Sequence, residues 1–422
     1  MNRHRIDPGW VVVFAGLGVN LVLGVLYAWG VISAALIDRQ GWSATMTQVP
    51  YMVACAVFAL SMVPGGRLQD RIGPRPVVMG AAVLAGIGFL MSGWVLTLTG
   101  LTAFFGIVFG AGMGLGYAAP TPAAVKWFSP RKRGLISGIV VSGFGLAPVY
   151  IAPLTTYLLN HFTLSQTFMI LGAGFFSLIM SLSLLIRNPT PERLAELAAI
   201  PSVPLTGTAG GGGLPKDDRS AHPPARREYD WDEAFRTPQF KLLWTMFCFG
   251  TFAGLLIIGQ MSKIGLEQAG IRNGFMLISV YAVFNCTGRI LCGMFSDLLG
   301  RMRTLRALFL LQVLTFALFA FLTTPLSKAA GVAIVGFTFG GMLSLFPATT
   351  ADFFGMRNFG VNYGMMLTAW GVGGVFGPLL GGIVRDATGA YVLSYVVSAV
   401  LSAAGALLTL ITKAPREPVR GD

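Results

Sequence analysis

One short pattern occurs twice in this chain: GRLQDRIG occupies residues 66–73 and GMFSDLLG occupies residues 293–300, an offset of 227 positions. A second echo accompanies it. RGLISG at residues 133–138 is matched by FGVNYG at residues 359–364, at an offset of 226. Because two separate echoes have offsets that differ by only one residue, we interpret the chain as a duplicated unit.

The composition indicates the solvent in which the two copies fold. Of the 422 residues, 54% are apolar and only 11% are charged, and the mean hydropathy is +0.70. A soluble globular protein carries about 25% charged residues. This balance excludes an ordinary cytosolic enzyme, a nucleic-acid-binding module and a disordered protein, and it predicts a chain that lies mostly in lipid.

The stretches without Asp, Glu, Lys or Arg indicate how many times the chain crosses the membrane. A helix needs about 20 residues to cross roughly 30 Å of hydrocarbon. Seven stretches suit one crossing, two suit a pair each, and one more contains a single charge, Arg289; these are 8–37, 40–66, 242–262, 307–327, 329–351, 358–384, 387–412, then 76–125 and 134–186, then 273–296. We therefore predict an all-α membrane protein with 12 transmembrane helices, a six-helix bundle at 1–186, a flexible linker at 187–238 and a second bundle at 239–422.

The basic residues predict the orientation. With both termini inside, 24 of the 30 Lys and Arg residues face the cytoplasm and five face outward, which is a strong positive-inside bias. The net charge of +13 then reflects orientation, so we expect no nucleic-acid partner. Asp7-Pro8 opens directly into a span with no apparent signal-peptide cleavage site. We expect a multi-pass protein of the plasma membrane or bacterial inner membrane.

Arg289 is the most informative residue. It precedes Asp297 by eight positions, which places it about 12 Å inside the end of its helix. An ionised Arg at mid-bilayer costs about 2.5–3.5 kcal/mol, and it normally faces a cavity or a partner. All seventeen acidic residues lie in loops, at helix ends or in the linker. The missing anion is then a carboxylate substrate held by the guanidinium fork; the alternative is a structural Arg that caps backbone carbonyls or reaches a loop acid.

Asn285 lies one turn from Arg289 on the same helix face. Its amide either orients the guanidinium and binds a substrate hydroxyl, or serves only to bond neighbouring helices. A duplicated six-helix unit places such residues at a central site between the halves, near mid-membrane.

The repeated motif resembles a known signature. Residues 66–75, with their copy at 293–303, resemble the helix 2–3 loop of the major facilitator superfamily. DPGW at 7–10 and WFSPRKRGLISG at 127–138 resemble the monocarboxylate porter family. RTPQF at 236–240, Leu243-Trp244 and LFP at 345–347 resemble the oxalate:formate antiporters. Both families transport small carboxylates.

The resemblance implies roles for particular residues. In both families the lone Arg of helix 8 binds the substrate carboxylate. Tyr27, Trp29 and Tyr117 resemble aromatic site residues of the oxalate:formate family, and Phe339 matches a cavity aromatic by position, although aromatic residues inside spans often only pack. Asn285 stands where lactate porters have an Asp implicated in proton coupling. Trp370 stands where the antiporter has a second cation, a Lys. With one buried cation, the site suits a monoanion and disfavours oxalate.

Charged residues at the cytoplasmic helix ends are candidates for a gate. We expect ion pairs that hold the inward side shut, with simple loop ordering as the alternative; the candidates are Asp70 with Arg71 and Arg75, and Asp297 with Arg301.

The sequence thus predicts a secondary transporter of small monocarboxylates, lactate-like acids first, working by proton symport and alternating access. Without an intramembrane acid, the proton would travel through the substrate and Arg289. The alternative is anion exchange of the oxalate:formate type. We expect a monomer in the lipid bilayer with no cofactor and no metal. The three histidines (His4, His161, His222) offer no acid–base pair for a membrane enzyme, whereas a carboxylate sensor would share the same site.

Overall fold

The computed structural model describes residues 7–198, 228–258, 261–271 and 274–415. Within these ranges the chain has twelve helices that are long and apolar enough to cross a membrane, which confirms the predicted number. They are Pro8–Gln40, Met46–Ile72, Pro74–Trp94, Leu98–Val125, Pro130–His161, Leu164–Ser183, Pro238–Leu256, Met276–Leu299, Arg301–Phe321, Pro325–Phe354, Phe359–Arg385 and Val392–Ile411.

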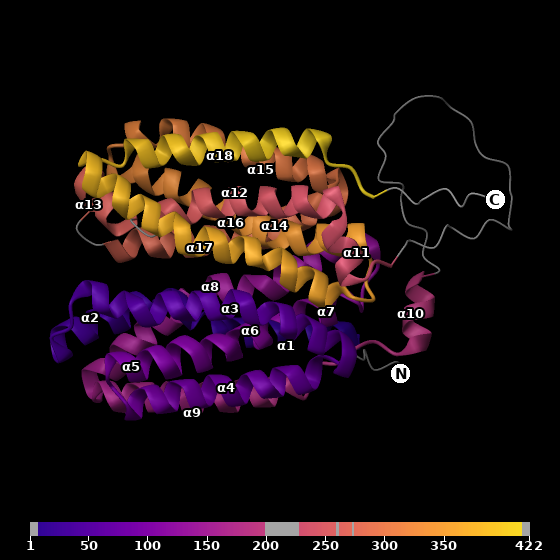
Figure 1. Cartoon of the computed structure of the whole chain (residues 1–422), viewed down its shortest axis with the longest axis horizontal. Coiled ribbons are helices and arrows are strands. Elements are labelled where there is room, and N and C mark those ends of the chain that lie inside the picture. Colours follow the sequence, from indigo (N-terminus) through magenta and orange to yellow (C-terminus); the bar gives the residue numbers. More distant parts are fainter. Residues whose placement is uncertain (1–6, 199–227, 259–260, 272–273, 416–422) are drawn as a thin grey trace, which may run out of the picture.

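The helices form two bundles that lie against one another (Figure 1). The first contains α1 (Pro8–Leu23), η1 (Gly24–Ala28), α2 (Trp29–Gln40), α3 (Ala44–Ile72), α4 (Pro74–Trp94), α5 (Leu98–Leu101), η2 (Thr102–Phe109), α6 (Gly110–Ala118), α7 (Pro120–Val125), η3 (Pro130–Lys132), α8 (Arg133–His161) and α9 (Leu164–Ser183). The second contains α12 (Pro238–Ile258), α13 (Met261–Ala269), α14 (Gly274–Leu299), α15 (Arg301–Leu318), η4 (Phe319–Phe321), α16 (Pro325–Phe354), α17 (Phe359–Thr388) and α18 (Val392–Ile411).

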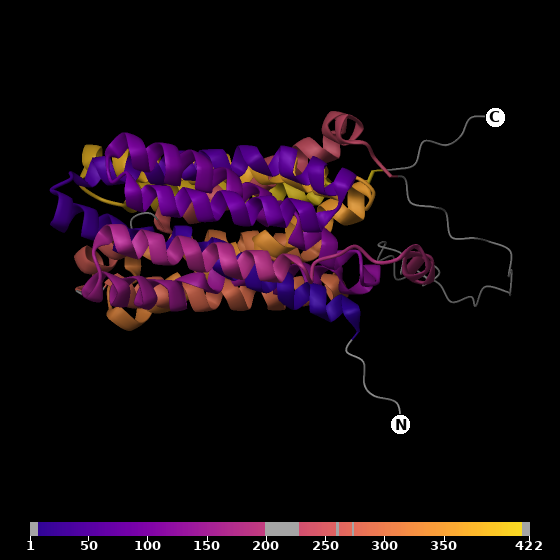
Figure 2. The same ribbon diagram turned by 90° about the horizontal axis from the view of Figure 1, so that it is seen from below.

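Two helix pairs make the main contact between the bundles. Helix α8 packs on α14, and α3 packs on α17. The start of α1, the end of α18 and the linker helices α10 (Pro191–Ala198) and α11 (Trp231–Arg236) all lie at the same end of the molecule (Figures 1 and 2). We call this the terminus end, and the positive-inside prediction assigns it to the cytoplasm.

The repeated pattern ends a helix in the same way in both halves. Gly73 follows α3 with φ of 88° and Gly300 follows α14 with φ of 92°. Only glycine adopts this region without strain. The backbone N–H groups of Gly73 and Gly300 donate to the backbone carbonyls of Gln69 and Ser296, respectively, one turn earlier. Helices α3 and α14 both extend beyond the uncharged stretches from which they were predicted. The absence of charge indicates which residues lie in the hydrocarbon core, and a helix can continue beyond that core.

The first transmembrane stretch changes its helix type in the middle. Residues Gly24–Ala28 form a 3-10 turn between α1 and α2. A side chain at Gly24 would collide with the Phe144 backbone and the Ala147 methyl of α8. The tight turn therefore lets the chain pass close to α8, and it directs Tyr27 toward the interface between the bundles.

The linker has two described helices. Helix α10 lies near the start of the linker. Helix α11 lies near its end and begins with a capping box formed by Asp230 and Glu233. The glycine run at 210–213, expected to be flexible, lies outside the described residues.

Candidate functional site

Arg289 lies at the contact between the two bundles and is fully buried. Its Nε donates to Asn285 Oδ1 at 2.8 Å, and its Nη1 donates to the backbone carbonyl of Val141 on α8 in the opposite bundle. Asn285 Nδ2 donates in turn to the Tyr281 hydroxyl at 3.0 Å. Within the described ranges, Nη2 has no hydrogen-bond partner, and Arg289 belongs to no ion pair. The guanidinium is thus oriented by neutral groups on two sides.

Close backbone approach makes this geometry possible. Gly138 of α8 lies directly against the Arg289 backbone. A Cβ placed on Gly145, two turns further along α8, would lie 2.5 Å from Asn285 Oδ1 and 3.1 Å from Arg289 Nε. Real Cβ atoms essentially never approach another heavy atom below 3.0 Å. Glycine at 145 therefore creates the space that the amide and guanidinium occupy.

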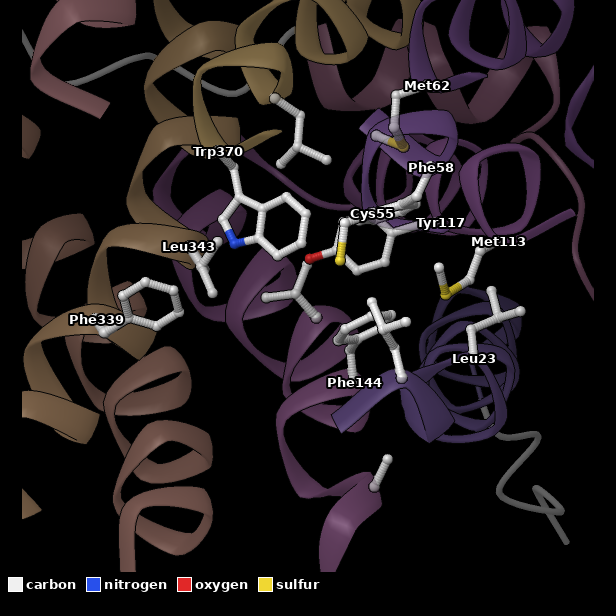
Figure 3. Close-up of a cluster of buried hydrophobic side chains, with 14 of the residues drawn as sticks. Leu23, Cys55, Phe58, Met62, Met113, Tyr117, Phe144, Phe339, Leu343 and Trp370 are labelled. Atoms are coloured by element: carbon white, nitrogen blue, oxygen red, sulfur yellow. The ribbon is translucent and has the colours of Figure 1, made fainter. Parts of the chain in front are cut away.

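Aromatic side chains surround the guanidinium. The phenols of Tyr27 and Tyr117 lie close enough to Arg289 to interact with its side chain and its charge. Each ring makes an edge contact with Phe144, with centroids 5.2 Å apart. Trp370 of α17 lies edge-on to Phe58 at 5.3 Å. In Figure 3 the Tyr117 hydroxyl points toward the second bundle, from which Trp370 faces it.

Two expected aromatic residues are placed differently. The structure does not bring Trp29 to Arg289: its Nε1 donates to the Thr47 carbonyl at 3.1 Å and its ring stacks on Phe105 at 4.3 Å, so it packs inside the first bundle. Phe339 is buried in the second bundle, 6.2 Å from the Tyr281 ring, and lies beyond Leu343 from Tyr117 (Figure 3).

Sequence reasoning missed two phenols of the site. Tyr281 lies one turn from Asn285 and two turns from Arg289, so the spacing of the three along one face of the helix was a usable signal. Tyr363 lies within the echo at 359–364, is fully buried, and packs toward Tyr117. No sequence signal distinguishes Tyr363 from a packing residue.

Asp297 closes one interface at the terminus end. Its carboxylate accepts from the Gly134 and Leu135 backbone N–H groups, both at 2.8 Å, at the start of α8 in the other bundle. Arg301 binds Asp297 at 2.6 Å and Asp352 at 2.8 Å. Asp352 also binds Arg133 at 2.9 Å. The four charges join the two bundles in one network.

Asp70 closes the second interface in an equivalent way. It accepts from the N–H groups of Gly360 at 3.1 Å and Val361 at 2.9 Å, at the start of α17. The pairing expected with Arg71 and Arg75 is wrong. Asp70 turns inward to Lys126 at 3.9 Å, whereas both arginines are exposed and Arg75 donates to the Leu184 carbonyl. Burial lowers the pKa of Lys126, and this effect outweighs the negative charges of Asp70 and Glu228, which raise the pKa.

The end of the linker also crosses this interface. Glu228 accepts from the Arg357 N–H at 2.8 Å, and the Tyr229 N–H donates to the Phe354 carbonyl at 3.0 Å, which ties residues 228–229 to the second bundle. Trp231 of α11 lies under the guanidinium of Arg67 from the first bundle, 5.9 Å from the ring centroid. We call residues 228–231 the strap.

A comparison with family models identifies the family of this duplicated helical fold. The model of the Major Facilitator Superfamily matches residues 10–370 and 277–422. The chain belongs to this superfamily. It is therefore a transporter and a multi-pass protein of the cell membrane, not an enzyme.

Curated relatives of this superfamily member cover nearly its whole length. It is 30% identical over 415 residues to the oxalate:formate antiporter of Oxalobacter formigenes, covering 97% of this chain and 92% of that protein. It is 27% identical to monocarboxylate transporter 13 of Bos taurus, covering 96% and 91%. It is 26% identical to the uncharacterized MFS-type transporter YhjX of Escherichia coli, covering 87% and 86%. The expected superfamily and the two expected families are thereby confirmed.

Solved structures share the fold of this superfamily member at low identity. The human organic anion transporter MFSD10 aligns with a TM-score of 0.68 at 15% identity, covering 96% of this chain and all of that one. The proton:xylose symporter XylE aligns with a TM-score of 0.69 at 13% identity, covering 96% of each chain. These similarities establish the arrangement of helices.

Proposed function

We propose that this superfamily member is a secondary transporter of small monocarboxylates, in which Arg289 binds the substrate carboxylate. One observation carries the proposal. The guanidinium is fully buried at the interface of the two bundles, has no ion pair among the described residues, and keeps Nη2 free of any hydrogen bond there. A buried cation without a counterion is costly, and a small anion from solution relieves that cost.

The hydrogen bonds of Arg289 refine how the carboxylate approaches. Because the Val141 carbonyl holds Nη1, the two-pronged fork expected from the sequence is not open in this conformation, and Nη2 is the available donor. The alternative hypothesis, that Arg289 has a structural role and caps a backbone carbonyl, therefore applies to its Nη1 atom and not to Nη2. Both neighbours of the guanidinium are neutral, so they orient the group without removing the need for an anion.

The aromatic lining favours a small monoanion. Trp370, Phe58 and Phe144 supply apolar walls near the guanidinium, and no second cation lies at their depth in the sequence. A dicarboxylate would leave one charge uncompensated in this environment, at a cost that a monocarboxylate avoids. Lactate-like 2-hydroxy and 2-oxo acids are thus the first candidates.

The two backbone caps support alternating access. Asp297 of the second bundle caps α8 of the first, and Asp70 of the first caps α17 of the second. A carboxylate at a helix N-terminus is favoured by the helix dipole, so these contacts stabilise closure at the terminus end. We assign Asp70, Asp297 and Arg301 to the gate, with Lys126, Arg133 and Asp352 added. Opening toward the cytoplasm requires that these contacts separate.

We propose that transport is coupled to protons through the substrate site and not through a separate carboxylate relay. Asp70, Asp297 and Asp352 are committed to the gate, and none stands beside Arg289. The proton would then move with the substrate at the Arg289 site, where anion binding neutralises the charge and permits closure. We further propose that the protein acts as a monomer.

Uptake of labelled lactate into proteoliposomes under an inward proton gradient tests the proposal. Wild type is expected to accumulate lactate, and Arg289→Ala to lose uptake. Arg306→Ala serves as the matched control, because Arg306 bonds to Thr409 on the far side of the same bundle. A screen of C1–C5 mono- and dicarboxylates by thermal shift should give a monocarboxylate response only in proteins that retain Arg289. Equal uptake by Arg289→Ala and wild type would refute the assignment.

Electroneutral anion exchange is the second candidate, favoured by the 30% identity to an oxalate:formate antiporter. Exchange predicts that uptake requires carboxylate inside the vesicle and ignores the pH gradient. Symport predicts uptake into empty vesicles that an ionophore abolishes. The two results exclude one another.

A further inference from the structure

A second buried polar atom near Arg289 lacks a partner. The Tyr363 side chain is fully buried, and its hydroxyl makes no hydrogen bond in the described part of the chain. An unsatisfied buried polar group is destabilising, and a native structure normally supplies a partner or an occupant. Together with Arg289 Nη2, this leaves two unsatisfied donors at the centre of the interface.

Both groups interact with the same phenol, that of Tyr117. Tyr363 lies seven residues before Trp370 on α17, which is about two turns and the same helix face. Its phenol packs toward that of Tyr117, and the charge of Arg289 acts on both. Gly364, the next residue, lies directly against the Met62 backbone of α3. This contact brings α17 close to α3 of the other bundle beside Tyr363.

Two kinds of neighbour surround the Tyr363 ring. Phe359 packs on the ring at 5.9 Å and supplies no polar atom, whereas the Tyr117 phenol interacts with both Tyr363 and Arg289. Tyr281, a further phenol near Arg289, accepts a hydrogen bond from Asn285. Tyr363 differs from Tyr281 because its hydroxyl makes no hydrogen bond of normal geometry within the described residues.

We propose that Tyr363 recognises the oxygen on carbon 2 of a 2-hydroxy or 2-oxo acid while Arg289 Nη2 holds its carboxylate. This rests on the proposed function. A phenol donates to a keto oxygen and exchanges hydrogen bonds with a hydroxyl, so one residue serves lactate and pyruvate alike. Acetate and propionate lack that oxygen and leave Tyr363 unsatisfied. Tyr363 thus sets the preference for 2-substituted acids.

Tyr363→Phe removes the hydroxyl and keeps the ring. A neutral hydrogen bond contributes about 0.5–1.5 kcal/mol, so the KM for lactate and pyruvate should rise roughly 2- to 12-fold, with the KM for propionate within about twofold of wild type. Because the lost hydroxyl is unsatisfied without substrate, the melting temperature of the substrate-free variant should stay equal or rise. The lactate-induced thermal shift should shrink while the propionate-induced shift persists.

Two control variants separate this role from others. Tyr281→Phe loosens Asn285, so it should weaken all acids alike. Tyr150→Phe removes a hydroxyl that bonds to the Leu21 carbonyl at 3.0 Å and should change no ratio between acids. An unchanged lactate-to-propionate ratio in Tyr363→Phe, or an equal loss for every acid, would overturn the inference and leave the monocarboxylate assignment intact. If wild type carries no monocarboxylate, the proposed function and this inference fail together.

Discussion

Gly145→Ala tests the geometry around Arg289 without touching a polar group. The added methyl would lie 2.5 Å from Asn285 Oδ1 and 3.1 Å from Arg289 Nε. To reach ordinary contact at 3.4 Å, the amide oxygen must retreat by about 0.9 Å. The hydrogen bond from Arg289 Nε to Asn285 Oδ1, now 2.8 Å long, would then be weakened or lost. We therefore expect the guanidinium to lose its orientation.

The expected effect follows from the strength of that bond. A hydrogen bond to a charged group contributes about 1.5–3 kcal/mol, which is about 10- to 150-fold in affinity. Alanine favours a helix over glycine by about 1 kcal/mol. Stability should therefore be maintained while the affinity for the carboxylate falls.

Lactate affinity is measured by thermal shift and by the KM for uptake. Gly80→Ala on α4 and Gly174→Ala on α9 are the matched controls, because a methyl at either position meets nothing within 4 Å. Both should bind lactate as wild type does. In a double-mutant cycle, adding Gly145→Ala to Asn285→Ala should cost much less than it costs alone, since the main collision is gone.

Wild-type affinity in Gly145→Ala would refute the reasoning about orientation. Strict additivity with Asn285→Ala would also refute it, because it would place the effect of the methyl elsewhere on α8.

Three further predictions concern charge and the gate. Trp370→Lys places a second cation near Arg289, so oxalate, which should not stabilise wild type, should raise the melting temperature of the variant; no oxalate response would contradict the single-cation argument. Asp352→Asn leaves the buried Arg301 and the half-buried Arg133 undercompensated and should cost about 3–5 kcal/mol of the closed state, seen as faster labelling of an engineered cysteine at the terminus end, whereas unchanged labelling would exclude Asp352 from the gate. Trp231→Ala removes the contact of the strap with Arg67, worth about 0.5–1 kcal/mol at an exposed site, and should increase the same labelling a few-fold; Trp231→Phe should retain part of the effect, and equal rates in all three proteins would leave the strap without a gating role.

Much of the fold was predictable because lipid imposes simple rules. A spanning segment must satisfy its backbone internally and exclude charge, so uncharged stretches reported the twelve crossings. The echo at 66–73 and 293–300 reported the duplication, and its final glycines, Gly73 and Gly300, adopt matching positive φ angles. These properties are local, or depend on spacing along one helix.

The site was predictable only in part. Arg289 and Asn285 could be found because depth and helical spacing are one-dimensional quantities. Trp29 was misassigned because an aromatic residue inside a span has the same pattern whether it lines a site or stacks on Phe105. The partner of Asp70 was misassigned because proximity in sequence favoured Arg71, whereas the helix directs the carboxylate inward to Lys126.

The sequence by itself determined that the chain crosses the membrane twelve times, is duplicated, and buries one arginine without an acid at its depth. Only the tertiary structure decided that Val141 holds one nitrogen of that arginine, that Asp70 and Asp297 each cap a helix of the opposite bundle, and that Tyr363 is buried against Tyr117 of that bundle. The reason is that these contacts join residues more than a hundred positions apart, through backbone groups that every residue carries. Nothing in the side-chain pattern records them.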